Sequence, residues 1–246
     1  MRSRKQIRAS RYDPDDPRVD TAAPDRHFSA GVLSLIEELV EEDVRQGWDA
    51  PPTFGFLFQR GRTPMQPGMS FHGMMFEWSP LPEATRALIR ARRPHHVVLH
   101  MAETYRRTPE HERPLPPGNL VAVGFMHEAW MVTPRTDDAA AVQEAMQAAR
   151  DRKVAEHPDR VEVKTVSAVD INGVRYSIFR PRSREHEGLA SASVAGSQGL
   201  QLGGDVVTSL HYLIEILQGH TVPDWPEFSR QYDPLDDLDP EANPQG

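Results

Sequence analysis

The chain has 246 residues, of which 38% are hydrophobic and 26% charged, and its formal net charge is −8. This length accommodates one large domain or two small ones with a substantial core. The absence of cysteine excludes disulfides, thiol nucleophiles and cysteine-ligated metal sites. The negative net charge disfavours general nucleic-acid binding by the whole chain. No apolar run reaches the roughly 20 residues needed to cross a membrane and no signal-peptide core is found, so we expect a cytoplasmic protein without a membrane partner.

The N-terminal segment, residues 1–26, opens with a cluster of positive charges. Its cations before the first acidic residue are Arg2, Arg4, Lys5, Arg8 and Arg11. Composition of this kind predicts a solvated, disordered arm. Phosphate binding by these five side chains is the alternative interpretation, and nucleic acid is expected as a partner only through them.

A single α+β domain is predicted over residues 27–221. Apolar residues at helical spacing predict a helix over Ser29–Gln46, and alternating phenylalanines predict a strand over Thr53–Gln59. A Pro- and Met-rich insert spans residues 61–82. The other elements predicted before residue 110 are a strand at Phe71–Trp78 and helices at Glu83–Arg92 and His96–Arg107, although VVLHM in the last of these could also be extended.

The second half of the domain begins with a strand over Asn119–Thr133, whose two faces are both largely apolar. This pattern predicts a central strand that is covered on both sides for much of its length. Asn172-Gly173 predicts a hairpin with a two-residue type I′ turn, which would pair Asp170 with Arg175 across the strands. The remaining predicted segments are a helix at Asp137–Lys153, a Gly/Ser-rich loop at 188–204, a helix at Asp205–Gln218 and an acidic, disordered tail at 222–246.

The order of these elements predicts the fold class. Neighbouring strands mixed with helices favour an α+β fold with a central, mainly antiparallel sheet of about four to five strands. The helices are expected to pack mainly on one face of that sheet.

Three features of the chain are distinctive: an acidic helix that runs into GWDAPP (Gly47–Pro52), a strand that ends in HEAWMV (His127–Val132), and the stretch HPDRVEVKTVSAVDINGVRYSIFR (His157–Arg180). In these features the chain is similar to a family of uncharacterised actinobacterial and actinophage proteins. Together they touch most of the region from Ser29 to Arg180. The resemblance implies an intracellular bacterial or phage setting and supports the fold, but it implies no activity.

His127 and Glu128 are the candidate catalytic residues. Consecutive side chains of a strand point to opposite faces, so these two cannot form a dyad with each other. An unpaired carboxylate is costly to bury in a central strand. Glu128 is therefore expected to have a raised pKa at a functional site, to pair with an arginine such as Arg175 or Arg180, or to reach the rim of the sheet through strand twist. His127 is likewise either a hydrogen-bonded core histidine or a ligand.

The candidate metal ligands are His96, His100 and Glu103, at positions i, i+4 and i+7 of a helix. Two histidines at this spacing can share a divalent metal ion. The zincin pattern is incomplete because Val97 stands where its glutamate is required. In a strand, His96 and His100 would be about 13 Å apart, which is too far for one metal. No cofactor other than a divalent metal is predicted, because the glycine-rich stretch at 196–205 lacks the lysine of a phosphate-binding loop.

No complete catalytic motif is found. We therefore expect an accessory or protein-interaction protein, whose partner is another protein or a second copy of the chain, rather than an enzyme. One alternative is a divalent-metal-dependent hydrolase that uses His96, His100 and Glu103. The other is a nucleic-acid-associated protein that uses the basic N-terminal arm.

Overall fold

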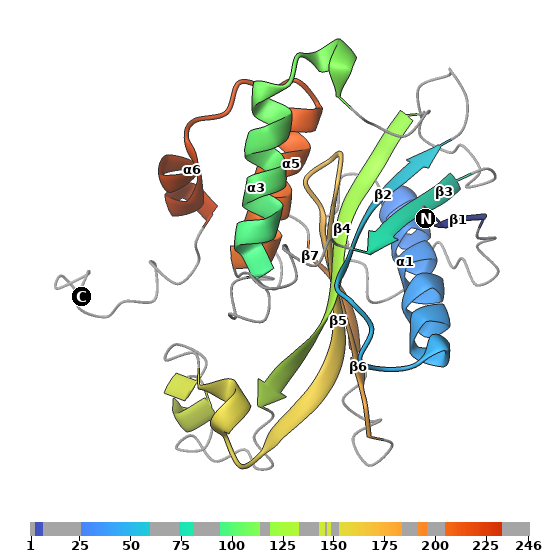
Figure 1. Ribbon diagram of the computed structural model, residues 1–246, viewed down its shortest axis with the longest axis vertical. Helices are drawn as coiled ribbons and strands as arrows, with labels where there is room; N and C mark the ends of the chain where they lie inside the picture. The colour runs from blue at the N-terminus through green and yellow to red at the C-terminus, as the bar shows by residue number, and fades with distance from the viewer. Residues whose placement is uncertain are drawn as a thin grey trace, which may run out of the picture.

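The computed structural model is built around an antiparallel sheet, shown in Figure 1. It describes residues 3–6, 26–59, 74–80, 94–113, 119–132, 143–145, 147–148, 153–183, 191–195 and 205–232. Within these residues the sheet has seven strands in the order β1-β3-β2-β4-β5-β6-β7. The strands are β1 (Ser3–Gln6), β2 (Thr53–Gln59), β3 (Met74–Pro80), β4 (Asn119–Val132), β5 (Arg160–Asp170), β6 (Arg175–Pro181) and β7 (Ser191–Ala195).

Helices cover both faces of the sheet. Helix α1 (Arg26–Gln46) packs on one face, and α3 (Pro94–Arg107), α5 (Asp205–Leu217) and α6 (Trp225–Tyr232) lie on the other (Figure 1). Two short 3-10 helices, η1 (Glu110–Glu112) and η2 (Val154–Glu156), lie in connections. The predicted α+β fold with an antiparallel sheet is confirmed, and most of the described helices share one face. The sheet has more strands than the four to five expected.

A hydrophobic core lies on each side of the sheet, and β4 contributes to both. Its Ala122 and Met126 belong to the core beneath α1. Val123 and Phe125 belong to the core beneath α3 and α5. The side chains of these four residues are at most 6% exposed, which confirms the predicted central strand covered on both faces. Burial of a side chain as large as that of Val123, Phe125 or Met126 stabilises the fold by about 1.5–3 kcal/mol.

The β5–β6 hairpin differs from its prediction by one residue of register. Val169 pairs with Arg175, so the predicted pairing of Asp170 with Arg175 is wrong. Of the turn residues only Gly173 has a positive φ, at 74°, which rules out a type I′ turn. The cause is the buried Asp170 carboxylate, which accepts hydrogen bonds from the Asn172 and Val174 backbone N–H groups at 2.8 and 3.0 Å. These bonds favour a three-residue turn that ends in a left-handed glycine.

Three ordered elements lie in segments for which composition predicts irregular structure. Strand β1 lies in the predicted disordered arm and contains Arg4 and Lys5, β7 lies in the loop 188–204, and α6 lies in the predicted acidic tail. Residues 3–6 and 225–232 therefore have regular structure in segments for which disorder was expected, and residues 191–195 form a strand in the segment expected to be a loop. Composition reflects only which residue types are present. It therefore cannot predict that a segment pairs with another strand or that a residue such as Phe228, which is 3% exposed, is buried by tertiary contacts.

Several predicted segments fall partly or wholly outside the described residues. They include Arg2, Arg8, Arg11, the helix at Glu83–Arg92 and most of the insert 61–82. The helix over His96–Arg107 is confirmed as α3, so the extended alternative is wrong. No helix in the described part of the chain has both the length and the apolar character needed to cross a bilayer.

Candidate functional site

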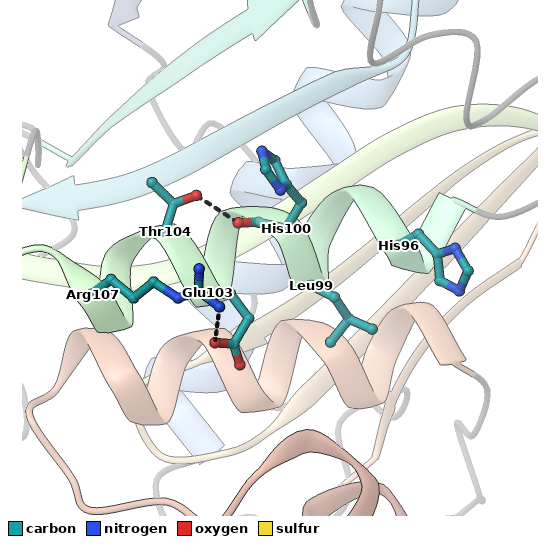
Figure 2. Close-up of a pocket in the computed structure, with 6 residues that line it drawn as sticks. All are labelled: His96, Leu99, His100, Glu103, Thr104 and Arg107. Atoms are coloured by element: carbon teal, nitrogen blue, oxygen red, sulfur yellow. Dashed lines mark hydrogen bonds and ion pairs between the residues drawn. The ribbon is translucent and has the colours of Figure 1, made fainter.

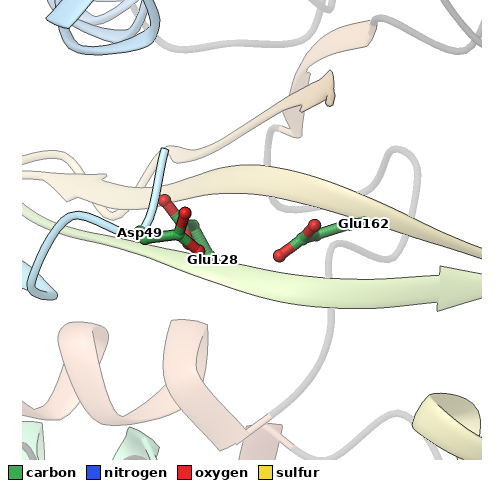
Figure 3. Close-up of side chains that lie close together, drawn as sticks. All are labelled: Asp49, Glu128 and Glu162. Carbon is green, nitrogen blue, oxygen red and sulfur yellow. The ribbon is translucent and has the colours of Figure 1, made fainter. Parts of the chain in front are cut away.

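The turn Gly47–Pro52, the end of β4 and the start of β5 lie together in space. The turn Gly47–Pro52 leaves α1 with positive φ angles at Gly47 (115°) and Asp49 (65°) and then leads into β2. The Ala50 backbone N–H donates a hydrogen bond to Glu128 Oε1 at 3.3 Å. Asp49, Glu128 and Glu162 each offer a carboxylate oxygen within 4.8 Å of the others, and Figure 3 shows them gathered beside β4 and β5. We call these three residues the acidic cluster.

A buried lysine compensates one side of the acidic cluster. Lys164 is 1% exposed and lies directly opposite Glu128 in the β4–β5 register. Its Nζ donates a short hydrogen bond to Asp43 and another, of 2.8 Å, to the Gly47 carbonyl at the end of α1. Glu128 Oε1 is 3.8 Å away, and the ammonium lies 5.1 Å from the centre of the Trp48 ring. Lys164 therefore fixes the C-terminal end of α1, where cations are favoured.

An arginine compensates the other side. Arg182 forms ion pairs with Glu162 at 2.8 Å and with Asp49 at 3.1 Å, and its guanidinium lies 5.5 Å from the centre of the Trp48 ring. The hydrogen bonds to Glu162 and then to Asp49 raise the pKa of Arg182. Trp48 thus contacts two cations. Oxygen ligands of this kind suit Ca²⁺ or Mg²⁺, but the protein's own cations already bind these carboxylates.

His127 and Glu128 lie on opposite faces of β4, as predicted for consecutive strand residues. Glu128 faces α1 and pairs with Lys164, not with the arginines that the sequence suggested. The His127 ring packs beside Phe125 with 5.0 Å between ring centroids. Its Nδ1 atom is buried and has no hydrogen-bond partner among the described residues. Burial lowers the pKa of His127 to about 4, so the imidazole is neutral at physiological pH.

The candidate metal ligands of α3 do not converge. His96, His100 and Glu103 line a hollow of about 330 Å³ on α3, and Figure 2 shows their side chains pointing in different directions. Glu103 is turned to α5, where its carboxylate accepts a hydrogen bond from the Tyr212 hydroxyl at 3.0 Å. The His96 ring packs against His95 with 4.3 Å between centroids. Among the described residues, the acidic cluster brings its ligand atoms within 4.8 Å of one another and the α3 triad does not.

The charged residues that lie around Glu128 were not identified from the sequence. Lys164, Asp49 and Glu162 belong to segments distant from Glu128 in sequence, and no local motif connects them. Trp130 was also missed. It is the one exposed large hydrophobic residue among the described side chains, at 43%, and the Arg160 guanidinium lies 5.3 Å from its ring centre.

The chain matches none of the protein-family models, curated proteins or solved structures with which it was compared. A function for it is therefore argued from the chemistry and geometry of its own residues.

Proposed function

We propose that this chain is a protein-interaction protein that binds an extended segment of a partner along the open edge of β4. β2 pairs with β4 only as far as Thr53 and Met126, whereas β5 accompanies β4 to Val132. Among the described residues, positions 127–132 of β4 therefore have a neighbouring strand on one side only. An edge of this kind presents backbone N–H and C=O groups to which a further strand can add.

Two prolines keep this edge open. Pro51 and Pro52 directly precede β2 and have no backbone N–H, so they cannot continue the ladder with β4 as donors. The N–H of Ala50 is also engaged, because it donates to the Glu128 side chain rather than to the β4 backbone. The chain before β2 is thereby held at the Glu128 side chain, and the backbone of residues 127–132 is left to a partner.

The observation that carries the proposal is the position of Trp130. It lies within the open edge, is 43% exposed and packs under the Arg160 guanidinium. Tryptophan and arginine are enriched among the residues that dominate binding energy at protein interfaces. A partner strand that covers the exposed part of this ring would remove apolar surface from water, at about 25 cal/mol per Å².

The setting of this interaction is also a proposal. The resemblance to actinobacterial and actinophage proteins and the absence of cysteine support a bacterial cytoplasm as the place where the chain acts. The partner is a protein, either of another sequence or a second copy of this chain.

The experiment uses a random-peptide display library selected on the full-length protein, together with sedimentation velocity to detect a second copy as partner. We expect the affinity for the selected peptides, or for a second copy of the chain, to be at least tenfold weaker in Trp130→Ala. Arg107→Ala is the matched control, because the Arg107 side chain is 82% exposed on α3, and this variant should bind as the parent protein does. Binding should slow amide hydrogen exchange at residues 127–132.

Two results would contradict the proposal. One is binding that is equally strong in Trp130→Ala and protects amides elsewhere. The other is a monomeric protein on which no peptide is selected.

A further inference from the structure

A second cluster of polar side chains lies at the C-terminal end of α5 and shares no residue with the acidic cluster. The helix ends in a left-handed glycine, Gly219, with φ at 80°. The Gly219 N–H donates to the Ile216 carbonyl at 3.1 Å, and the His220 N–H donates to the Glu215 carbonyl at 3.0 Å. This pair of bonds is the Schellman arrangement, which reverses the chain in a fixed way. The reversal places His220 Nδ1 2.7 Å from Glu215 Oε2.

The other oxygen of the same carboxylate meets a second histidine. His211 precedes Glu215 by one helical turn, so the two side chains share a face of α5. His211 Nε2 lies 3.3 Å from Glu215 Oε1. The ring is held in place from two sides. It makes an edge contact with Phe228 of α6, at 5.7 Å between centroids, and a Cβ on Gly173 would lie only 3.5 Å from its Nε2 atom.

The three side chains offer the ligand chemistry of a transition-metal ion. Two imidazole nitrogens and a carboxylate oxygen, with water in the remaining position, are a ligand set that Zn²⁺ accepts. A histidine must be neutral to bind a metal. Burial, and after it the positive charge of Arg175, lower the pKa of His211, which favours that neutral form. The charge of Glu215 offsets the repulsion that Arg175 would exert on a bound cation.

We propose that His211, Glu215 and His220 form a binding site for a divalent transition-metal ion such as Zn²⁺. The two rings now flank the carboxylate, and the ligand atoms are not gathered within 4.8 Å of one another as those of the acidic cluster are. Metal binding therefore requires the His220 ring to turn toward His211. The His220 side chain is 56% exposed, so the turn meets little steric resistance, while His211 and Glu215 stay in place on the helix.

The bound ion would tie three parts of the fold together. His211 contacts α6 and the β5–β6 turn, and His220 begins the connection from α5 to α6. The Gln218 side chain already donates a hydrogen bond to the Ile171 carbonyl of the β5–β6 turn at 2.9 Å. A metal at this place would therefore stabilise the packing of α5 against the hairpin and α6.

The test is a Zn²⁺ titration of the untagged, full-length protein against a chromophoric chelator, with Co²⁺ absorption as a second readout of nitrogen ligation. We expect one equivalent of metal, with affinity at least tenfold weaker in His220→Gln and in Glu215→Gln. His220→Gln keeps the backbone cap and a side-chain donor for Glu215, so it separates ligation from folding. The double variant His96→Ala/His100→Ala is the control and should bind as the parent protein does.

Three results would overturn the proposal. The first is a protein that retains no metal against the chelator. The second is metal binding that is unchanged in both α5 variants. The third is metal binding that is lost in the α3 control, which would move the site to the hollow of Figure 2.

Discussion

Replacing Lys164 by methionine should destabilise the fold more than any other single loss of charge in the candidate site. Methionine keeps an unbranched apolar stem of similar length but removes the ammonium. The Asp43 carboxylate and the Gly47 carbonyl then lose their donor, and Glu128 loses its nearest cation, at 3.8 Å. Trp48 also loses one of its two cation contacts.

The size of the effect follows from burial. Removing one partner of a buried ion pair costs about 3–5 kcal/mol, because the other charge is left without compensation. Asp43 and Glu128 keep 21% and 17% of their side-chain exposure, so water can partly replace the ammonium. The expected loss in the free energy of unfolding therefore lies at the lower end of that range, about 3 kcal/mol.

The assay is urea denaturation at neutral pH, followed by tryptophan fluorescence and by far-UV circular dichroism. Arg45→Ala is the matched control, because Arg45 is 70% exposed and pairs with Glu42 on the surface of α1. That control should cost less than about 1 kcal/mol. In a double-mutant cycle with Asp43→Asn, the coupling energy with Lys164 should exceed about 1 kcal/mol. A loss in the free energy of unfolding below about 1 kcal/mol for Lys164→Met, or a coupling energy near zero, would refute the assignment of Lys164 as the cation that anchors α1.

Two further predictions concern the adjacent residues of β4. Glu128→Gln should lower the free energy of unfolding by about 1 kcal/mol at neutral pH, because the charge that faces Lys164 is lost. If urea denaturation instead shows a change within about 0.5 kcal/mol, Glu128 acts as a surface residue. His127 has a pKa of about 4 in the folded state against 6.5 when unfolded, so stability is lost as the pH falls from 6.5 toward 4, because only the unfolded chain takes up the proton there. At pH 5 this loss in the free energy of unfolding amounts to about 2 kcal/mol. His127→Gln should remove it. If the parent protein and His127→Gln lose the same stability from pH 7 to pH 5 in urea denaturation, His127 is not buried as a neutral ring.

The elements that the sequence predicts well are those whose pattern is local. Helices α1 and α5 have apolar stripes and glycine ends, and the long apolar run of β4 indicates a central strand. Helix α6 does have apolar residues at helical spacing, at Trp225, Phe228 and Tyr232, but the acidic, proline-containing composition around it favoured an irregular tail. Strand β1 lacks such a pattern, because it depends on a ladder with β3. Tertiary contacts of this kind are invisible to composition and periodicity.

The candidate site shows the same division. Glu128 could be singled out from sequence because a carboxylate in an apolar strand requires compensation. Its partner could not, because the pairing of Glu128 with Lys164 depends on the β4–β5 register. The one-residue error at the β5–β6 turn shows how sensitive such assignments are. A shift of one residue moves every side chain of a strand to the other face.

The compensated charges and the open edge of β4 have a common origin in the turn Gly47–Pro52. Lys164 binds the carbonyl at the start of this turn, and Arg182 pairs with Asp49 in its middle. Glu128 receives the Ala50 N–H, so all three contacts hold the chain against side chains of the sheet and not against the β4 backbone. The prolines that follow then delay the β2–β4 ladder until Thr53. The acidic cluster is thus best explained as part of the anchor that keeps β2 away from residues 127–132, and this arrangement leaves those residues with one neighbouring strand among the described residues.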